Sequence, residues 1–498
     1  MKNRLFLAGS TLLLILLSSS PILAYQGRMM GMGDPFGLVE DESDFLVHPA
    51  AIAAGKGTIY YGTYQFMYDR IDDMNFHTTF TEQGEEPAPY LYNSDGHDLK
   101  NECRAGMVFP AARGRMGIFF EYTRDRGDFE GDQSSDPDIG FTYDMASTIN
   151  DYALRLLYGM PLSSCLAGAE LQIASRVEKN ENTLYYDGLA TWNLPVGGPV
   201  ANILHLMIPY DSRFWEAQAK LSATGKTGSL PYAFTLHGGV PFSAKNKYDF
   251  GQTGAGSVAL DGDVKGWNAG ADAWLRMPLS GNLSLPFVLS VSYKDTKRDG
   301  DALGIVDYSH EAKDLALETG GGLDYTTASG ARTAAGFYYD YLHLDQNFTF
   351  TMIGTPTSVD DYDDYPKHVE HRFTCKTAAE KDYSPSLAIR AGLNLFYGWV
   401  DRDYAYVMSR TNGFLYPVDI SGDGYTWGAN VSAGATVKLN QVSIEPFAKC
   451  GYQKLKLDGD GSSTVRGSFS DTSIDYYTGT GYYEKTNWFV GAGFSLRL

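Results

Sequence analysis

The end of the chain alternates regularly between apolar and mixed side chains. One face of this stretch carries Trp488, Val490, Ala492, Phe494, Leu496 and Leu498. The intervening positions carry Asn487, Phe489, Gly491, Gly493, Ser495 and Arg497. A side-chain period of two over about ten residues is what a membrane-spanning β-strand requires. The stretch therefore predicts a strand that turns one face to lipid and the other to the interior of a barrel.

Similar alternation recurs along the chain. One alternating strand could belong to a soluble protein, but the repetition favours a barrel. Segments of this kind begin near Met116, Ala167, Leu283, Leu387 and Tyr425. Three of the short connections between them begin alike, at Phe109-Pro110, Met160-Pro161 and Met277-Pro278. Proline ends a strand there because it has no N–H group for the hydrogen-bond ladder.

Short and long connections alternate, as they do in transmembrane barrels. Long polar connections are expected at about 70–96, 125–148, 179–211, 243–263, 295–308, 345–365, 401–424 and 458–482. The first strand is expected at 58–68. The chain is therefore predicted to be all-β, a transmembrane antiparallel up-and-down β-barrel of 14–16 strands, with 16 favoured. A soluble sandwich or propeller is disfavoured, because the faces opposite the apolar ones carry many charges.

The first 24 residues are typical of a secretory signal peptide. Lys2 and Arg4 precede the apolar run Leu5 to Leu17, and Ala24 is the expected last residue removed. A transmembrane anchor is the alternative, but the run is shorter than the ~20 residues that a helical span needs. Since no other long apolar run exists, an exported chain of this kind belongs to the bacterial outer membrane or is fully soluble.

The composition limits the classes of molecule that the protein is expected to bind. The 498 residues are 43% hydrophobic and 14% aromatic, with a net charge of -20 that becomes -22 without the signal peptide. Such acidity argues against binding nucleic acid or docking on anionic headgroups.

Charges of both signs lie on the faces that would point into the barrel, because lipid excludes them. The expected lumen-lining residues are Glu121, Arg155, Glu170, Arg176, Glu216, Lys220, Asp272, Arg276, Glu370, Arg372 and Arg390. They fit a hydrated pore whose lining sets solute selectivity. They fit equally an ionic network that holds a plug in a narrow lumen, and the sequence leaves both readings open.

No motif predicts catalysis, a cofactor or a metal. The four cysteines share no CxxC spacing, and neither a CxxCH haem motif nor a GxSxG nucleophile is present. His368 and His371 would lie on opposite faces of a strand, which separates them as ligands. We therefore expect a protein that is not an enzyme and holds no cofactor.

The mature N-terminus carries the most specific string. Arg28-Met29-Met30-Gly31-Met32-Gly33 leads through an acidic stretch, Glu40 to Asp44, to His48-Pro49-Ala50 before the first strand. This order resembles the start of the FadL-like superfamily of outer-membrane barrels, where Asn stands at the position of His48. The superfamily includes FadL-type channels for hydrophobic compounds and PorV-like barrels associated with secretion.

The resemblance implies that residues 25–56 fold inward as a hatch, and that residues 57–498 form the barrel. The hatch residues would be Gly31, Gly33, Asp41, Asp44, His48, Pro49 and Ala50. The glycines permit sharp backbone turns, and the proline fixes an extended approach. A flexible periplasmic tail is the alternative.

Together these features favour passive transport of small hydrophobic or amphipathic molecules across the outer membrane. The alternative is a sealed structural or docking barrel of a secretion or electron-transfer complex. The expected partners are outer-membrane lipid and the outer-membrane assembly machinery, which would read the closing strand. In that strand the residues concerned are Trp488, Val490, Phe494, Leu496 and Leu498. The sequence identifies neither the solute nor a protein partner.

Overall fold

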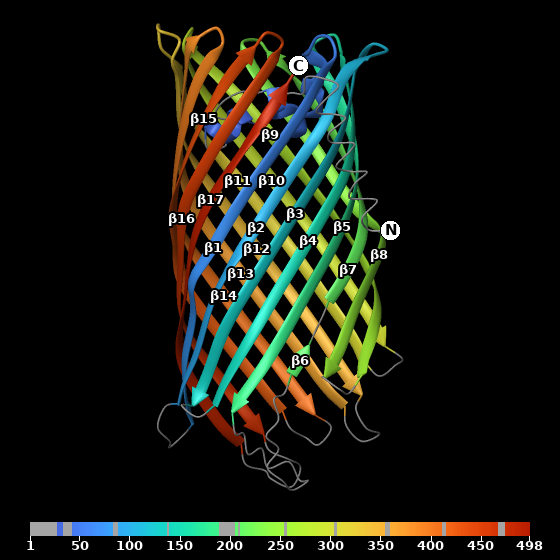
Figure 1. The fold of residues 1–498 in the computed structure, drawn as a ribbon, viewed down its shortest axis with the longest axis vertical. Coiled ribbons are helices and arrows are strands. Elements are labelled where there is room, and N and C mark those ends of the chain that lie inside the picture. The colour runs from blue at the N-terminus through green and yellow to red at the C-terminus, as the bar shows by residue number, and fades with distance from the viewer. Residues whose placement is uncertain are drawn as a thin grey trace.

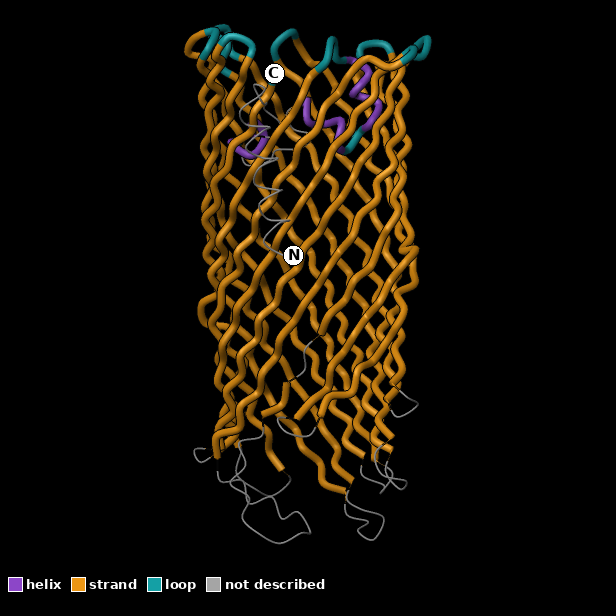
Figure 2. Tube along the Cα trace, turned by 45° about the vertical axis from the view of Figure 1, so that its right-hand side comes forward, coloured by secondary structure: helices purple, strands orange, loops and turns teal. Residues whose placement is uncertain are grey.

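The computed structural model describes residues 27–32, 42–82, 88–136, 139–188, 205–207, 210–252, 256–302, 306–353, 359–410, 415–466 and 474–498. These residues form one antiparallel sheet that closes on itself, with three short helices inside it at one end (Figures 1 and 2). The prediction of an all-β closed barrel is confirmed.

The helices are α2 (Gly27–Gly31), η1 (Glu42–Leu46) and η2 (Pro49–Ala54). The strands are β1 (Ile59–Glu82), β2 (Ala88–Ala111), β3 (Gly114–Asp136), β4 (Ile139–Pro161), β5 (Cys165–Gly188), β6 (His205–Met207), β7 (Tyr210–Thr227), β8 (Leu230–Gln252), β9 (Gly256–Ser280), β10 (Leu283–Ala302), β11 (Val306–Thr326), β12 (Arg332–Ile353), β13 (Val359–Ser384), β14 (Leu387–Arg410), β15 (Leu415–Leu439), β16 (Val442–Arg466) and β17 (Ile474–Arg497).

The ring contains sixteen strand positions, as the sequence favoured. Short β6 pairs with β5 and β8 beyond the end of β7, so that β6 and β7 share one position in the ring. The last strand pairs with the first, from Tyr61 opposite Arg497 to Glu82 opposite Tyr477. This seam leaves the sheet without an edge, which lipid requires of a spanning sheet.

The outward face carries a continuous apolar belt near the short-turn end. On β17 the side chains of Trp488, Val490 and Phe494 are 53%, 51% and 43% exposed, whereas Ser495 is fully buried. On β14 the outward apolar positions run from Leu387 to Trp399. At ~3.3 Å per residue and a tilt of ~40°, this run covers about 30 Å, close to the apolar band of a membrane barrel.

Aromatic pairs mark the far edge of this belt, as the girdle of a membrane barrel does. They include Tyr122–Tyr152, Trp215–Phe242, Trp267–Tyr293, Tyr397–Trp399 and Tyr452–Trp488, with ring centroids 4.5–6.4 Å apart. The apolar belt and the aromatic girdle together identify the outer surface as membrane-facing.

The expected lengths of the connections were wrong. Most residues predicted to form long polar loops are strand, and β1 runs on to Glu82 instead of ending near 68. Apart from the short β6, the strands have 18–26 residues. Beyond the belt both faces of a strand meet water, so the alternation fades while the hydrogen-bond ladder continues.

The ladder has small register shifts at several places among the described strands, and its longest interruption lies between β8 and β9. Pairing between β8 and β9 stops at Gly239 opposite Asn268 and resumes at Asn246 opposite Gly262. Gly266 lies in the part of β9 that does not pair with β8, and its φ is 153°. This interruption separates the membrane-facing part of β8 from its outer continuation.

Candidate functional site in the barrel lumen

Residues 44–54, which we call the docked segment, lie against the inner wall near the short-turn end (Figure 2). The segment begins in η1 and ends in η2, where Pro49 occupies the first turn and needs no N–H partner. Pro49, Ala50 and Ile52 are buried. The wall here is β3, β4, β5 and β7, all of which contact η2.

Three glycines let the backbone of the docked segment approach the strands closely. They are Gly117 on β3, Gly159 on β4 and Gly168 on β5, and we call them the glycine seat. Gly159 and Gly168 are directly paired across the sheet. A Cβ atom at position 168 would overlap the backbone of Ala50, and one at position 117 would lie 2.8 Å from Cδ1 of Ile52. At position 168, where the obstacle is backbone, no other residue type fits without moving the segment.

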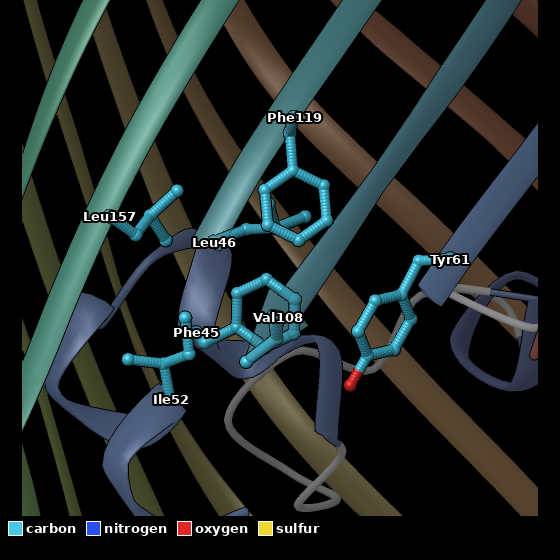
Figure 3. Close-up of a cluster of buried hydrophobic side chains, with 7 residues drawn as sticks. All are labelled: Phe45, Leu46, Ile52, Tyr61, Val108, Phe119 and Leu157. Carbon is cyan, nitrogen blue, oxygen red and sulfur yellow. The ribbon is translucent and has the colours of Figure 1, made fainter. Parts of the chain in front are cut away.

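An apolar cluster fills the space beside the seat (Figure 3). The rings of Phe45 and Phe119 have centroids 5.4 Å apart, and those of Phe45 and Tyr61 are 5.6 Å apart at 61°. The cluster consists of Phe45, Leu46, Ile52, Tyr61, Val108, Phe119 and Leu157. Burying side chains of this size stabilises docking by roughly 1.5–3 kcal/mol each.

Two hydrogen bonds position the middle of the docked segment. The backbone N–H of Ala50 donates to Oγ of Ser222 at 2.6 Å. Nδ1 of His48 lies 2.8 Å from Oγ1 of Thr235, which is fully buried. Burial lowers the pKa of His48 from 6.5 to about 4, the Lys220 charge lowers it too, and Asp272 opposes both. The imidazole is therefore neutral near pH 7.

An ionic network holds the carbonyl oxygen of Leu46. Nη2 of Arg155 donates to this oxygen at 2.9 Å, and Nζ of Lys220 donates to it at 2.7 Å. Arg155 also forms paired hydrogen bonds to Glu170 at 2.9 Å and one to Glu121 at 3.0 Å. The structure thus brings together four of the residues that the sequence singled out for the lumen.

Helix α2 docks at a second place on the wall. Met29 and Met32 pack with Val288, Ala334, Tyr338 and Ala378. Nε of Arg28 donates to Glu380 at 3.1 Å, and the backbone N–H of Arg28 donates to Glu445 at 3.0 Å. Arg390 bonds to the same Glu380 at 2.9 Å. A polar cavity of about 570 Å³ adjoins these groups.

The remaining predicted lumen residues lie elsewhere on the wall. Asp272 accepts a hydrogen bond from Ser290 at 2.7 Å, and Arg276 shares Asp324 with Arg332. Glu370 lies 3.7 Å from His368 and Arg372 lies 3.2 Å from Asp340. Arg176 and Glu216 line a separate pocket near the girdle. These pairs lie at separate places around the wall, within one strand for His368 and Glu370 and between strands for the others, and they do not converge on one point.

Sequence reasoning missed several groups that hold the docked segment or helix α2. They are the glycine seat, Ser222 and Thr235 at the docked segment and Glu380 at α2. They attracted no attention, since small or polar residues on inward positions are common in strands. The only feature of the sequence that could have pointed to them was their place on the inward-facing positions of the strands. Gly33 and Asp41 lie outside the described residues, as does the predicted signal peptide, whereas Gly31 ends α2.

A mainly apolar cavity of about 640 Å³ lies beside the docked segment. Its lining includes His48 and Ala51 from the segment, and Leu166, Tyr232 and Trp274 from the wall. A more polar pocket of about 500 Å³ lies farther from the short turns. Within the described ranges, no three His, Cys, Asp or Glu side chains gather closely enough to hold a metal ion. No helix in the described part of the chain is long and apolar enough to cross a membrane.

Comparison with known proteins gives structural matches only. No family model and no curated protein matches the sequence. The chain is similar to a Pseudomonas aeruginosa FadL homologue, with 12% identity over 96% of this chain and 99% of that one, at a TM-score of 0.40. It is also similar to a deletion mutant of the TodX monoaromatic hydrocarbon channel, with 10% identity over 95% and 99% of the two chains and a TM-score of 0.38. The CymD monoaromatic hydrocarbon channel matches with 11% identity over 95% and 97%, at 0.32.

Proposed function

We propose that this chain is a bacterial outer-membrane channel for passive uptake of small hydrophobic or amphipathic molecules, with residues 25–56 as its hatch. In this proposal residues 1–24 are a signal peptide and residues 57–498 are the barrel. The role is transport, without catalysis or a cofactor. The charged wall residues line the passage, and the closing strand is read by the assembly machinery.

The observation that carries the proposal is the contrast between the two sides of the wall and the segment docked inside. The outside is apolar over the height of a membrane, whereas the inside carries ion pairs and cavities. A barrel of sixteen strands is wide enough to leave a water-filled channel. The docked segment is held against the glycine seat at one end of the barrel. This position supports the idea that the segment closes the lumen and that a passing solute would have to displace it.

The sharpest test changes the seat and leaves the rest of the barrel intact. Gly168→Val places a side chain against the backbone of Ala50, so docking should fail. We expect stable ion conductance in planar bilayers, and entry of benzenesulfonate, an amphipathic ion that does not cross lipid unaided, into proteoliposomes. Gly281→Ala is the matched control, because a Cβ at position 281 meets nothing within 4 Å.

Deleting residues 26–56 provides a second route to the open state. If neither Gly168→Val nor the deletion conducts, although both proteins form heat-modifiable barrels, the transport proposal is wrong. A stoichiometric protein partner recovered with such a sealed barrel would favour the docking role instead.

A further inference from the structure

The polar pocket near the girdle contains a row of amide side chains around a glycine. Gln172 on β5 pairs with Gln218 on β7, Gln218 pairs with Gly239 on β8, and Gly239 pairs with Asn268 on β9. We call Gln172, Gln218 and Asn268 the amide row. All three line the pocket of about 500 Å³. The pocket has the volume of a small-molecule site.

Gly239 forms a floor against which two of these amides pack. A Cβ at this position would lie 2.7 Å from Cγ of Gln218 and 3.0 Å from Nδ2 of Asn268. Any larger residue would therefore push the two amides apart or fill the space between them. The floor lies where the β8–β9 ladder is interrupted.

A carboxylate orients two members of the amide row. Nε2 of Gln218 donates to Oε1 of Glu216 at 2.9 Å, and Nδ2 of Asn268 donates to the same oxygen at 2.5 Å. With both nitrogen ends turned to Glu216, the carbonyl oxygens of the two amides remain as hydrogen-bond acceptors for a ligand. Acceptors of this kind suit the O–H groups of a solute.

The other side of the pocket combines an aromatic ring with an ion pair. Arg176 donates to Asp151 at 2.7 and 2.9 Å, and its guanidinium lies 5.8 Å from the ring centroid of Phe214. Arg176, Asp151 and Glu216 are thus engaged within the pocket. Glu121 also lines it and pairs with Arg104 and Arg155 outside it, and Lys294 is a further charge on the lining. Phe214 offers a flat apolar surface for the C–H face of a ring.

We propose that this pocket is a binding site for a neutral, polyhydroxylated ring of the size of a monosaccharide. The amides around the edge of the pocket match the hydroxyl groups of such a ring, and Phe214 matches its apolar face. A charged solute gains less. To pair with Arg176 or Asp151 it must first displace the other member of that ion pair. The inference rests on the proposed function and specifies the amphipathic solute that the channel selects.

The test measures binding directly, by titration calorimetry of the full-length detergent-solubilised protein with D-glucose and with D-glucuronate, which keeps the ring and adds a carboxylate. We expect saturable binding of glucose and weaker binding of glucuronate. Gly239→Val and Gln218→Leu should each weaken glucose binding about tenfold, the loss expected from one or two hydrogen bonds. Gln453→Leu, which removes an inward amide from β16 outside the pocket, should leave it unchanged.

Absence of saturable glucose binding, preference for glucuronate, or equal loss in Gln453→Leu would overturn the proposal. Because binding needs no flux, a glucose site in a barrel that never conducts would refute transport and leave the site standing. Conversely, a barrel that passes benzenesulfonate but binds no glucose would refute only the site. Heat-modifiable migration of each variant establishes that the barrel has folded.

Discussion

His48 is the residue whose side chain we expect to couple docking of residues 44–54 to acidity. The residue lies in a buried contact with Thr235, with Asp272 and Lys220 as the charged groups that act on it. Asparagine, which occupies this position in the family that the N-terminus resembles, can donate and accept hydrogen bonds without titrating. The histidine therefore adds a pH dependence that an amide lacks.

We expect docking of residues 44–54 to weaken as the pH falls from about 6.5 to about 4. The docked pKa of His48 is lowered from 6.5 to about 4, so the undocked state binds more protons in this window, and docking loses up to about 3 kcal/mol. Above pH 7 docking should be constant. Hydrogen exchange of peptides covering 44–54, corrected for the intrinsic rate at each pH, measures this change. The variant His48→Asn should show no such dependence, and an identical pH response in both proteins would contradict the assignment.

The closing strand illustrates how one element decides whether the barrel exists. β17 pairs with both β16 and β1, so it completes the ring. Its outward residues face lipid, and its inward Ser495 is packed against Thr63 at 3.2 Å between the two hydroxyl oxygens. Without this strand, β1 and β16 would each expose an unpaired edge to lipid.

Replacing Phe494 and Leu498 together by Asp should abolish outer-membrane insertion. Both positions lie on the apolar face that we expect the assembly machinery to read, and a carboxylate on the lipid face is unfavourable. Membrane fractionation and heat-modifiability on gels measure the outcome. Phe489→Asp, on the inward face of the same strand, is the comparison and should insert far better. Normal insertion of the double variant would refute the role of this strand as a signal.

At the scale of the whole molecule, the barrel is much taller than a membrane. A spanning strand needs about 9–11 residues, whereas β14 has 24. Its outward face changes from Trp399 to Asp401 and Asp403, both exposed. The part of β14 beyond Trp399 would extend about 25 Å past the apolar belt, at ~3.3 Å per residue and a tilt of ~40°.

Two arginine substitutions on the same face of β14 test this placement. Leu395→Arg puts a charge inside the belt and should cost about 2–4 kcal/mol of unfolding free energy. Asp403→Arg lies beyond the girdle and should change it by less than about 0.5 kcal/mol. Denaturant unfolding in lipid vesicles measures both values. Equal costs at the two positions would show that the membrane boundary is elsewhere.

The sequence by itself determined the class of fold and the direction of most side chains, and it favoured sixteen strands without excluding fourteen. Lipid on one side and water on the other impose an alternation that can be read residue by residue, as from Trp488 to Leu498. The sequence did not determine where the strands end outside the apolar belt, because water on both faces of a strand removes the alternation of apolar and polar residues. Nor could it show that Gly117, Gly159 and Gly168 form one seat, or that Gln218 and Asn268 flank Gly239. Each group comes from three successive strands, and the register between those strands, together with the path of the N-terminal segment inside the barrel, brings its members together.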